Sequence, residues 1–409
     1  MTFKQGEILA GLDIGTSKTC AIIAEVTSKG RLNIIGAGSA PSKGIQKGTV
    51  TNIDAAAQGI KKAIESAELI ANCEIQSVIV DITGNHIQGM NSNGLAPVKS
   101  AEIDESDIAR VLESAKAVAI PPDREFLHVL AQEYILDGQE GIRNPKGMSG
   151  VRLEAKVHII TGAVNNAQTI VKCVNRCNLE VADMVVAGLA ASEAVISDDE
   201  KELGCALVDI GSGTTDIAVW SHGALVHSHV LGLSGNHLTS DIAKGLQIPL
   251  TDAEKLKIQS GYAMVSAVGA DEVIYAPTPD GREAKKLPKQ VLAEIIEPRL
   301  EEIFEMVNRE IEKSGYKSAI PAGIILTGGT SIMNAVPELA EHVFGVPVRR
   351  GVPRDVDGLI DFVQNPQYST AIGLLLHAIN HPDISTYSPQ EARKSSPLGK
   401  FISWLKQIV

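Results

Sequence analysis

Two short segments of this chain repeat one arrangement, in which an apolar run ends in an aspartate and a glycine turn rich in hydroxyl groups follows. The first is Asp13-Ile14-Gly15-Thr16-Ser17-Lys18, and the second, 196 residues later, is Asp209-Ile210-Gly211-Ser212-Gly213-Thr214-Thr215-Asp216. One such segment is ordinary turn chemistry. Two of them, each leading into a second apolar strand, predict a pair of hairpins that face one ligand.

The residue types in both turns suit a polyphosphate with its metal ion. Proteins bind such groups with backbone N–H groups, which glycine leaves accessible, and with hydroxyls. Asp13 and Asp209 are candidates to hold Mg²⁺ through its water shell, because this ion gives up water reluctantly. The phosphate-binding candidates are Gly15, Thr16, Ser17, Lys18, Gly211, Ser212, Gly213, Thr214 and Thr215.

A third segment supports the pair of turns. The predicted strand Ala322–Leu326 runs into Thr327 and then into Gly328, Gly329 and Thr330. A double glycine after a strand is common turn chemistry by itself. At this stage of the chain it predicts a backbone wall against which a nucleoside can lie in the same cleft.

The order of predicted elements indicates two related α/β domains. With 409 residues, 44% hydrophobic and 21% charged, the chain is a folded protein with more than one core. Its formal charge of −12 argues against a general nucleic-acid binder. Each hairpin belongs to a predicted set of three strands, and helices follow each set. These strands are Ile8–Leu12, Ala21–Val26 and Leu32–Gly38 in the first block and Cys205–Asp209, Ile217–Trp220 and Ala224–Val230 in the second.

The character of the chain changes over residues 84–162, which are richer in Asn, Asp and Gly and predict a small inserted α+β subdomain. A long helix is predicted over Pro288–Ser314. We expect the following division: 1–83, 163–203 and 359–380 as the first domain, 84–162 as the insert, 204–240 and 315–358 as the second domain, 241–314 as its outer subdomain, 381–396 as a linker and 397–409 as a terminal amphipathic helix.

The C-terminal tip has the composition of a helix that lies in a membrane interface. One helical face is apolar, the other carries lysines, and from Arg393 onward there are four basic residues and no acidic one. The tip is too short to span a bilayer, and a helix docked on the protein's own core is the alternative. One such helix binds weakly, which favours a polymer that presents several. The expected membrane contacts are Lys400, Phe401, Ile402, Trp404, Leu405, Lys406 and Ile408.

The two turns and the double glycine, in this order, resemble the actin-like ATPase superfamily, in which ATP lies between two related α/β domains. The resemblance implies that Glu254 and Lys257 approach the ribose and adenine; a solvated helix face is the alternative for both. It also places interdomain connections at Val186–Ala191 and Tyr368–Gly373. Some members carry a glutamate beside the attacking water where this chain has Ala187, so weak or no ATPase activity is expected, with no catalytic residue assigned.

Within the superfamily, nearly the whole chain resembles the FtsA family of cell-division proteins. Besides the two turns, this resemblance rests on the segments Gly235–Ala243, Ile296–Arg299 and Tyr368–Leu375 and on the C-terminal tip. The resemblance implies an ATP-binding protein that polymerises on the cytoplasmic face of the bacterial inner membrane at the septum. It further implies tethering of the FtsZ ring, with the FtsZ C-terminal peptide on residues 241–314 near Arg299 and Lys289, and recruitment of later division proteins.

Two other functions use the same fold. A sugar or acid kinase would need a catalytic aspartate near a second-substrate pocket, and no such motif stands out in the sequence. A PilM-type adaptor of pilus machines shares the fold but is not expected to end in a basic amphipathic tip. Neither alternative explains residues 397–409.

Overall fold

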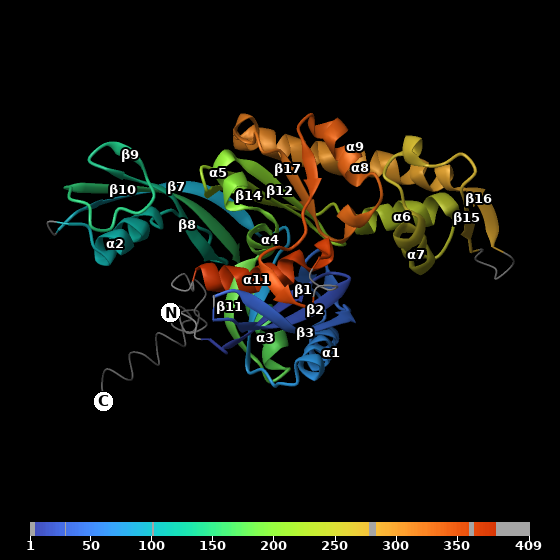
Figure 1. The fold of residues 1–409 in the computed structure, drawn as a ribbon, viewed down its shortest axis with the longest axis horizontal. Helices are drawn as coiled ribbons and strands as arrows, with labels where there is room; N and C mark the ends of the chain where they lie inside the picture. The colour runs from blue at the N-terminus through green and yellow to red at the C-terminus, as the bar shows by residue number, and fades with distance from the viewer. Residues whose placement is uncertain (1–4, 29, 100–101, 278–283, 360–363, 382–409) are drawn as a thin grey trace.

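The computed structural model describes residues 5–28, 30–99, 102–277, 284–359 and 364–381. Figure 1 shows an elongated molecule with the inserted subdomain at one end of the long axis and α6, α7, β15 and β16 at the other. The sheet that carries the N-terminal hairpin lies to one side of this axis, with α1 and α3 on its outer face. The expected linker and terminal helix lie outside the described residues. Within the described part, no helix has the length and apolar character needed to cross a bilayer.

The first domain is built on a six-stranded sheet in the order β11-β6-β1-β2-β3-β19. β1 is antiparallel to β2 but parallel to β6, with Leu12 beside Val80. The strands are β1 (Ile8–Ile14), β2 (Lys18–Val26), β3 (Leu32–Pro41), β6 (Ser77–Ile82), β11 (Glu180–Val186) and β19 (Val356–Gly358), with the small pair β4 (Ile45–Gln46) and β5 (Thr49–Val50). The helices are α1 (Ile53–Ala71), α3 (Val164–Asn175), α4 (Ala187–Val195), α5 (Asp198–Leu203) and α11 (Ser369–Asn380).

The second domain repeats this sheet. Its order is β14-β13-β12-β17-β18, so the hairpin β12–β13 is again flanked by an antiparallel strand on one side and a parallel strand on the other. The strands are β12 (Cys205–Ile210), β13 (Thr215–Ser221), β14 (Ala224–Leu231), β17 (Ile324–Thr327) and β18 (Val348–Arg350). Helix α9 (Val336–Phe344) connects β17 to β18. The matching strand orders confirm the prediction of two related α/β domains.

The outer part of the second domain is helical, and the predicted long helix is confirmed. α8 covers Lys289–Ser314 and buries Leu292, Ile296 and Phe304 against the second domain's core. The other elements here are α6 (Gly235–Leu246), α7 (Leu250–Ser260), β15 (Val273–Ala276) and β16 (Lys285–Pro288). Short 3₁₀ turns cover η1 (Val265–Ala267), η2 (Lys317–Ala319), η3 (Gly329–Ile332) and η4 (Pro366–Tyr368).

The insert is an antiparallel sheet in the order β7-β10-β8-β9 with one helix on it. Its elements are β7 (Gln88–Pro97), α2 (Glu105–Ala115), β8 (Arg124–Leu136), β9 (Gln139–Ile142) and β10 (Arg152–Ala163). A core of its own supports it, separate from the two domain cores. It also joins the second domain, because His158 Nε2 lies 2.8 Å from Ser228 Oγ and the Asn91 amide donates to Val226 O at 3.1 Å.

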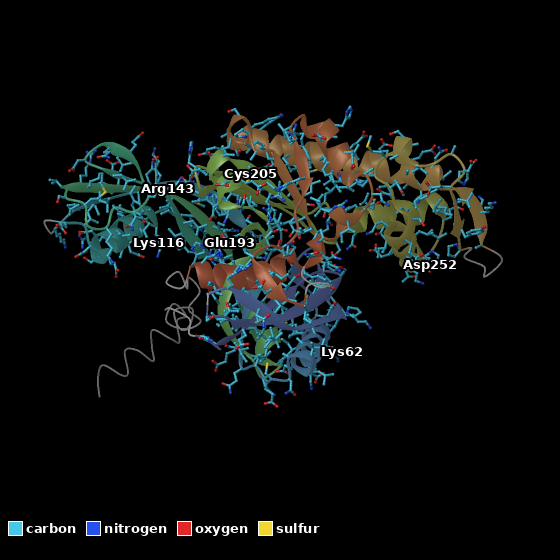
Figure 2. The ribbon with its side chains drawn as sticks, viewed as in Figure 1. Lys62, Lys116, Arg143, Glu193, Cys205 and Asp252 are labelled. Carbon is cyan, nitrogen blue, oxygen red and sulfur yellow. The ribbon has the colours of Figure 1, made fainter. Side chains whose placement is uncertain are left out.

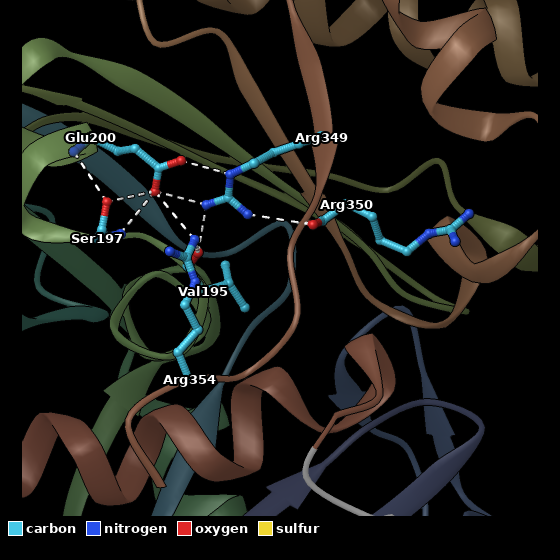
Figure 3. A network of polar contacts seen from close by, with 6 residues as sticks. All are labelled: Val195, Ser197, Glu200, Arg349, Arg350 and Arg354. Carbon is cyan, nitrogen blue, oxygen red and sulfur yellow. Dashed lines mark hydrogen bonds and ion pairs between the residues drawn. The ribbon is translucent and has the colours of Figure 1, made fainter.

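A polar network secures the region where the chain crosses between domains (Figure 3). Glu200 on α5 accepts from Arg349 Nε at 2.6 Å and from Arg354 Nη2 at 3.3 Å, and both arginines also donate to Val195 O. Burial alone would raise the pKa of Glu200, but hydrogen bonds from Arg349 and Ser197 lower it to about 2. The network therefore ties the end of α4 to the segment that returns from β18 to the first domain.

Candidate functional site

The turns of the hairpins β1–β2 and β12–β13 open onto one cleft of about 520 Å³ between the two domains. The turn after β17, helix α7 and the turn before α11 complete its walls. Among the residues predicted to bind nucleotide or metal, Thr215 alone does not line the cleft. Its hydroxyl donates to Leu233 O at 2.7 Å and its side chain is buried. Lining candidates are Asp13, Gly15, Thr16, Ser17, Lys18, Asp209, Gly211, Ser212, Gly213, Thr214, Glu254, Lys257, Gly328, Gly329 and Thr330.

The two hairpin turns touch each other at Gly213. A Cβ atom at this position would overlap the Thr16 hydroxyl, which itself accepts a hydrogen bond from Gly48 N at 3.0 Å. Glycine is therefore required for the approach of the domains as well as for access to backbone N–H groups. The sequence predicted only the second of these roles.

The turn after β17 is joined to the second hairpin. Gly328 has φ +83°, and a Cβ there would overlap Asp209 Oδ1. The Thr330 hydroxyl donates to Gly211 O at 3.3 Å, whereas a side chain at Gly329 would meet nothing within 4 Å. The cleft is therefore open beside Gly329, at the start of the 3₁₀ turn Gly329–Ile332.

Four buried carboxylates converge behind the hairpin turns. Besides Asp13 and Asp209 they are Asp81, which accepts from Ile14 N at 2.7 Å, and Asp216, which accepts from the Thr83 hydroxyl at 2.7 Å. Burial raises the pKa of Asp13 and of Asp216 to about 6. Burial, with the neighbouring aspartates, raises the pKa of Asp209 to about 8 and that of Asp81 well above its usual value.

Lys18 places a positively charged side chain near these acids. Its amine donates to Gln367 O at 2.8 Å and lies 3.8 Å from the centre of the Tyr368 ring. Burial lowers the pKa of Lys18, so its charge is also costly here. Four carboxylates that burial disfavours as anions are the environment that a bound divalent cation would relieve. Carboxylate oxygens are the ligands that Mg²⁺ prefers, so the residues present fit this ion.

Glu254 and Lys257 lie on the cleft face of α7 as a paired unit. Lys257 Nζ is 2.7 Å from Glu254 Oε2 and donates to Gly235 O at 3.1 Å and to the Thr239 hydroxyl at 2.9 Å. The Lys257 side chain is 8% exposed, which is unusual for a lysine and incompatible with a solvated helix face. Burial lowers its pKa.

Several lining residues were not expected from the sequence. Asp81 lies within β6, an ordinary buried strand, and Thr83 directly follows that strand. Thr370 lies in the first turn of α11, where its hydroxyl donates to Asp209 Oδ2 at 3.2 Å. Only the fold brings these residues to the hairpins. Ala187 lines the cleft at the start of α4, so its methyl group stands at the first interdomain connection.

The two expected peptide-binding cations are already paired within the chain. Arg299 Nε lies 2.5 Å from Asp241 Oδ2, and its guanidinium also pairs with Glu302. Lys289 Nζ is 2.8 Å from Glu272 Oε2 and 4.1 Å from the centre of the Tyr262 ring. An acidic peptide would have to exchange with these internal carboxylates.

Comparison with known proteins gives one consistent family. Residues 206–373 match the family model described as cell division protein FtsA, and residues 84–161 match the model described as SHS2 domain inserted in FTSA. A cell division protein FtsA of Pseudomonas aeruginosa is 50% identical over 92% of this chain and 90% of its own length. The Escherichia coli K12 protein of the same description is 42% identical over 98% of this chain and 96% of its own length.

Solved structures share the fold at much lower identity. The PilM–PilN type IV pilus biogenesis complex aligns with a TM-score of 0.64 at 18% identity, over 91% of this chain and 98% of that one. MreB5 of Spiroplasma citri bound to ADP aligns with a TM-score of 0.55 at 14% identity, over 91% and 96%. These likenesses confirm the predicted actin-like ATPase fold, and the SHS2 match confirms its inserted subdomain.

Proposed function

This chain belongs to the FtsA family of cell-division proteins, and we propose that it binds Mg-ATP between its two domains, polymerises on the cytoplasmic face of the bacterial inner membrane and tethers the FtsZ ring there. The observation that carries the nucleotide part is the cleft into which both hairpin turns open beside four buried aspartates. The amphipathic residues 397–409 carry the membrane part. The insert, residues 84–162, would contact later division proteins and neighbouring subunits.

Each wall of the cleft has a distinct task in this proposal. The turns at Gly15 and Gly211 present backbone N–H groups and hydroxyls to the phosphates, and Lys18 adds a positive charge. Asp13 and Asp209 hold the water shell of Mg²⁺, and the ion relieves the cost of their burial. The Glu254–Lys257 pair faces the ribose and base. Mg²⁺ itself would supply neutralisation of the phosphate charge.

The PilM-type and kinase alternatives are less well supported. The PilM likeness rests on the fold at 18% identity, whereas the FtsA relatives are 42–50% identical over nearly their whole length. The family model for the insert matches residues 84–161 as well, and neither alternative calls for that domain.

Recruitment of FtsZ to vesicles tests the tethering function. With Mg-ATP and anionic liposomes, the full chain is expected to carry FtsZ into the floating lipid fraction, and FtsZ alone is not. Arg299→Ala should weaken this recruitment several-fold, because it removes the guanidinium beside Asp241 that is proposed to meet the acidic peptide. Arg309→Ala on the same helix, whose side chain is 66% exposed and paired with Glu305, is the matched control and should have no effect. Failure of the unaltered chain to recruit FtsZ would refute the tethering role.

Hydrolysis of the bound ATP is expected to be slow. Ala187 offers no group to orient an attacking water at the start of α4, where some relatives of this fold place a glutamate. A phosphate-release assay on the purified chain with liposomes should detect only slow release of phosphate. Sustained release of many phosphates per minute would contradict the view that ATP acts here as a conformational ligand.

A further inference from the structure

Three side chains of metal-binding type meet at the end of α11, away from the cleft. They are Glu193 on α4, His377 on α11 and His381 directly after it. Their ligand atoms, one from each residue, all lie within 4.8 Å of one another. Figure 2 labels Glu193 beside α11. Two imidazoles and a carboxylate are a common donor set for zinc and similar ions.

His377 has no evident structural role for its ring nitrogens. The residue is 2% exposed, and neither Nδ1 nor Nε2 has a hydrogen-bond partner among the described residues. A buried polar group without a partner destabilises the fold, so such groups are rare and call for an explanation. A ligand on one ring nitrogen would supply it.

The backbone presents the two histidines to the same point. They are four residues apart, and His381 N donates to His377 O at 2.9 Å, so the helical turn continues to the second histidine. Their ring centres are 4.8 Å apart. Histidines at this spacing on one helical face are a recurring arrangement for zinc.

Glu193 supplies a carboxylate that is held as an anion. Its side chain is 3% exposed, and burial alone would raise its pKa, but hydrogen bonding by His381 and the charge of Lys201 lower it below the usual value. Lys201 Nζ is 2.9 Å from Oε1, and the Asn380 amide donates to Oε2 at 3.0 Å. His381 Nε2 lies 3.7 Å from Oε1 as well. A metal would therefore bind Glu193 either on Oε1, beside the Lys201 contact, or on Oε2, in place of the exposed Asn380 amide.

We propose that Glu193, His377 and His381 form a binding site for a divalent transition-metal ion of the zinc type. Zinc bonds of about 2.0–2.1 Å in a tetrahedral site place ligand atoms about 3.3 Å apart. The three donors therefore need only small side-chain rotations to reach one ion, and a water completes the four ligands.

The proposed metal site and the nucleotide cleft lie on the same two helices, α4 and α11. α4 begins at Ala187 and α11 carries Thr370 in its first turn, and both residues line the nucleotide cleft. Glu193 and His377 lie toward the opposite ends of these helices, which pack closely along their length, with a Cβ at Gly373 overlapping Ala190 O. The metal would fix the two helices against each other at the end remote from the cleft.

Cobalt titration of the full chain, without a polyhistidine tag and after chelator treatment, tests the proposal. Co²⁺ should produce the visible absorption of a four-coordinate site that saturates at one equivalent and is displaced by Zn²⁺. His381→Ala, at a half-buried position, and Glu193→Gln should each weaken Co²⁺ binding by at least about tenfold. His229→Ala is the control for a second group of histidines, because His227 and His229 lie 3.8 and 3.7 Å from Glu310 Oε1, and it should leave binding unchanged.

Thermal unfolding supplies an independent readout. Zn²⁺ should raise the unfolding midpoint of the unaltered chain and of His229→Ala, but not that of His381→Ala, whose fold is checked by circular dichroism without metal. Absence of saturable Co²⁺ binding by the unaltered chain would overturn the proposal. Equal binding by His381→Ala and His229→Ala would overturn it too, because the metal would then lie elsewhere.

Discussion

Asp209→Asn is expected to make the nucleotide-free protein more resistant to heat while abolishing its stabilisation by Mg-ATP. Burial and the aspartates around it raise the pKa of Asp209 to about 8, so the ionised carboxylate is unfavourable in the folded state without a cation. An asparagine has nearly the same shape and no charge to bury, but it cannot hold Mg²⁺. The two effects therefore have opposite signs in one variant.

Thermal unfolding with and without Mg-ATP measures both the stability of the nucleotide-free protein and its stabilisation by the nucleotide. We expect the midpoint of the nucleotide-free Asp209→Asn protein to rise by about 2 °C or more at neutral pH. At a hundredfold excess over its dissociation constant, Mg-ATP should stabilise the unaltered chain by about 2.7 kcal/mol and this variant hardly at all. Asp357→Asn, on a side chain that is 58% exposed, is the control and should change neither quantity. A variant that is less stable without nucleotide, or still stabilised by it, would contradict the assignment.

The same carboxylate gives the nucleotide-free protein a defined pH dependence. Because the folded pKa of Asp209 is raised from 3.8 to about 8, the folded state binds more protons than the unfolded state between these values. This contribution to stability is complete below pH 3.8 and is lost as the pH rises through about 8. The decline should be smaller in Asp209→Asn and in the presence of Mg-ATP.

Ile402→Glu in the terminal segment is expected to remove most of the membrane binding. Ile402 lies on the apolar face of the predicted amphipathic helix, and loss of one buried side chain of this size costs about 1.5–3 kcal/mol, or at least about tenfold in affinity. The measurement is co-sedimentation with anionic liposomes. Ser403→Glu adds the same charge on the polar face and should retain most of the binding.

Two outcomes would contradict this account of the tip. Equal losses in Ile402→Glu and Ser403→Glu would show that only net charge matters. Unchanged liposome binding after deletion of residues 397–409 would show that the chain attaches through another surface, and the alternative of a helix docked on the protein's own core would then be preferred.

The hairpins could be predicted from the sequence because aspartate, glycine and hydroxyl residues follow one another within each turn, and the β1–β2 and β12–β13 pairs appear where expected. The edge strand β7 could not, since burial alternates along it but its mostly polar or small residues show no matching alternation of apolar and polar types. Thr215 was predicted as a phosphate ligand because it belongs to the same run of hydroxyls, but strand alternation turns it toward Leu233. Proximity in sequence does not determine on which face of a strand a side chain lies.

The remaining cleft residues depend on tertiary structure. Asp81 lies within a strand that has no turn motif, and it reaches the site because β6 pairs in parallel with β1. The role of Gly213 as a contact point between domains depends on Thr16, from a hairpin almost two hundred residues away in the sequence. The ion pair of Arg299 with Asp241 likewise joins α8 to α6, and no local sequence pattern predicts it.

In the proposed function, Mg-ATP in the interdomain cleft sets the arrangement in which the protein polymerises on a membrane. Electron microscopy of the full chain on a lipid monolayer tests it most directly, with the unaltered protein and Asp209→Asn compared at equal surface density. We expect filaments for the unaltered chain with Mg-ATP, and few or none without nucleotide or with Asp209→Asn. Filaments of equal number and length in all three samples would contradict it.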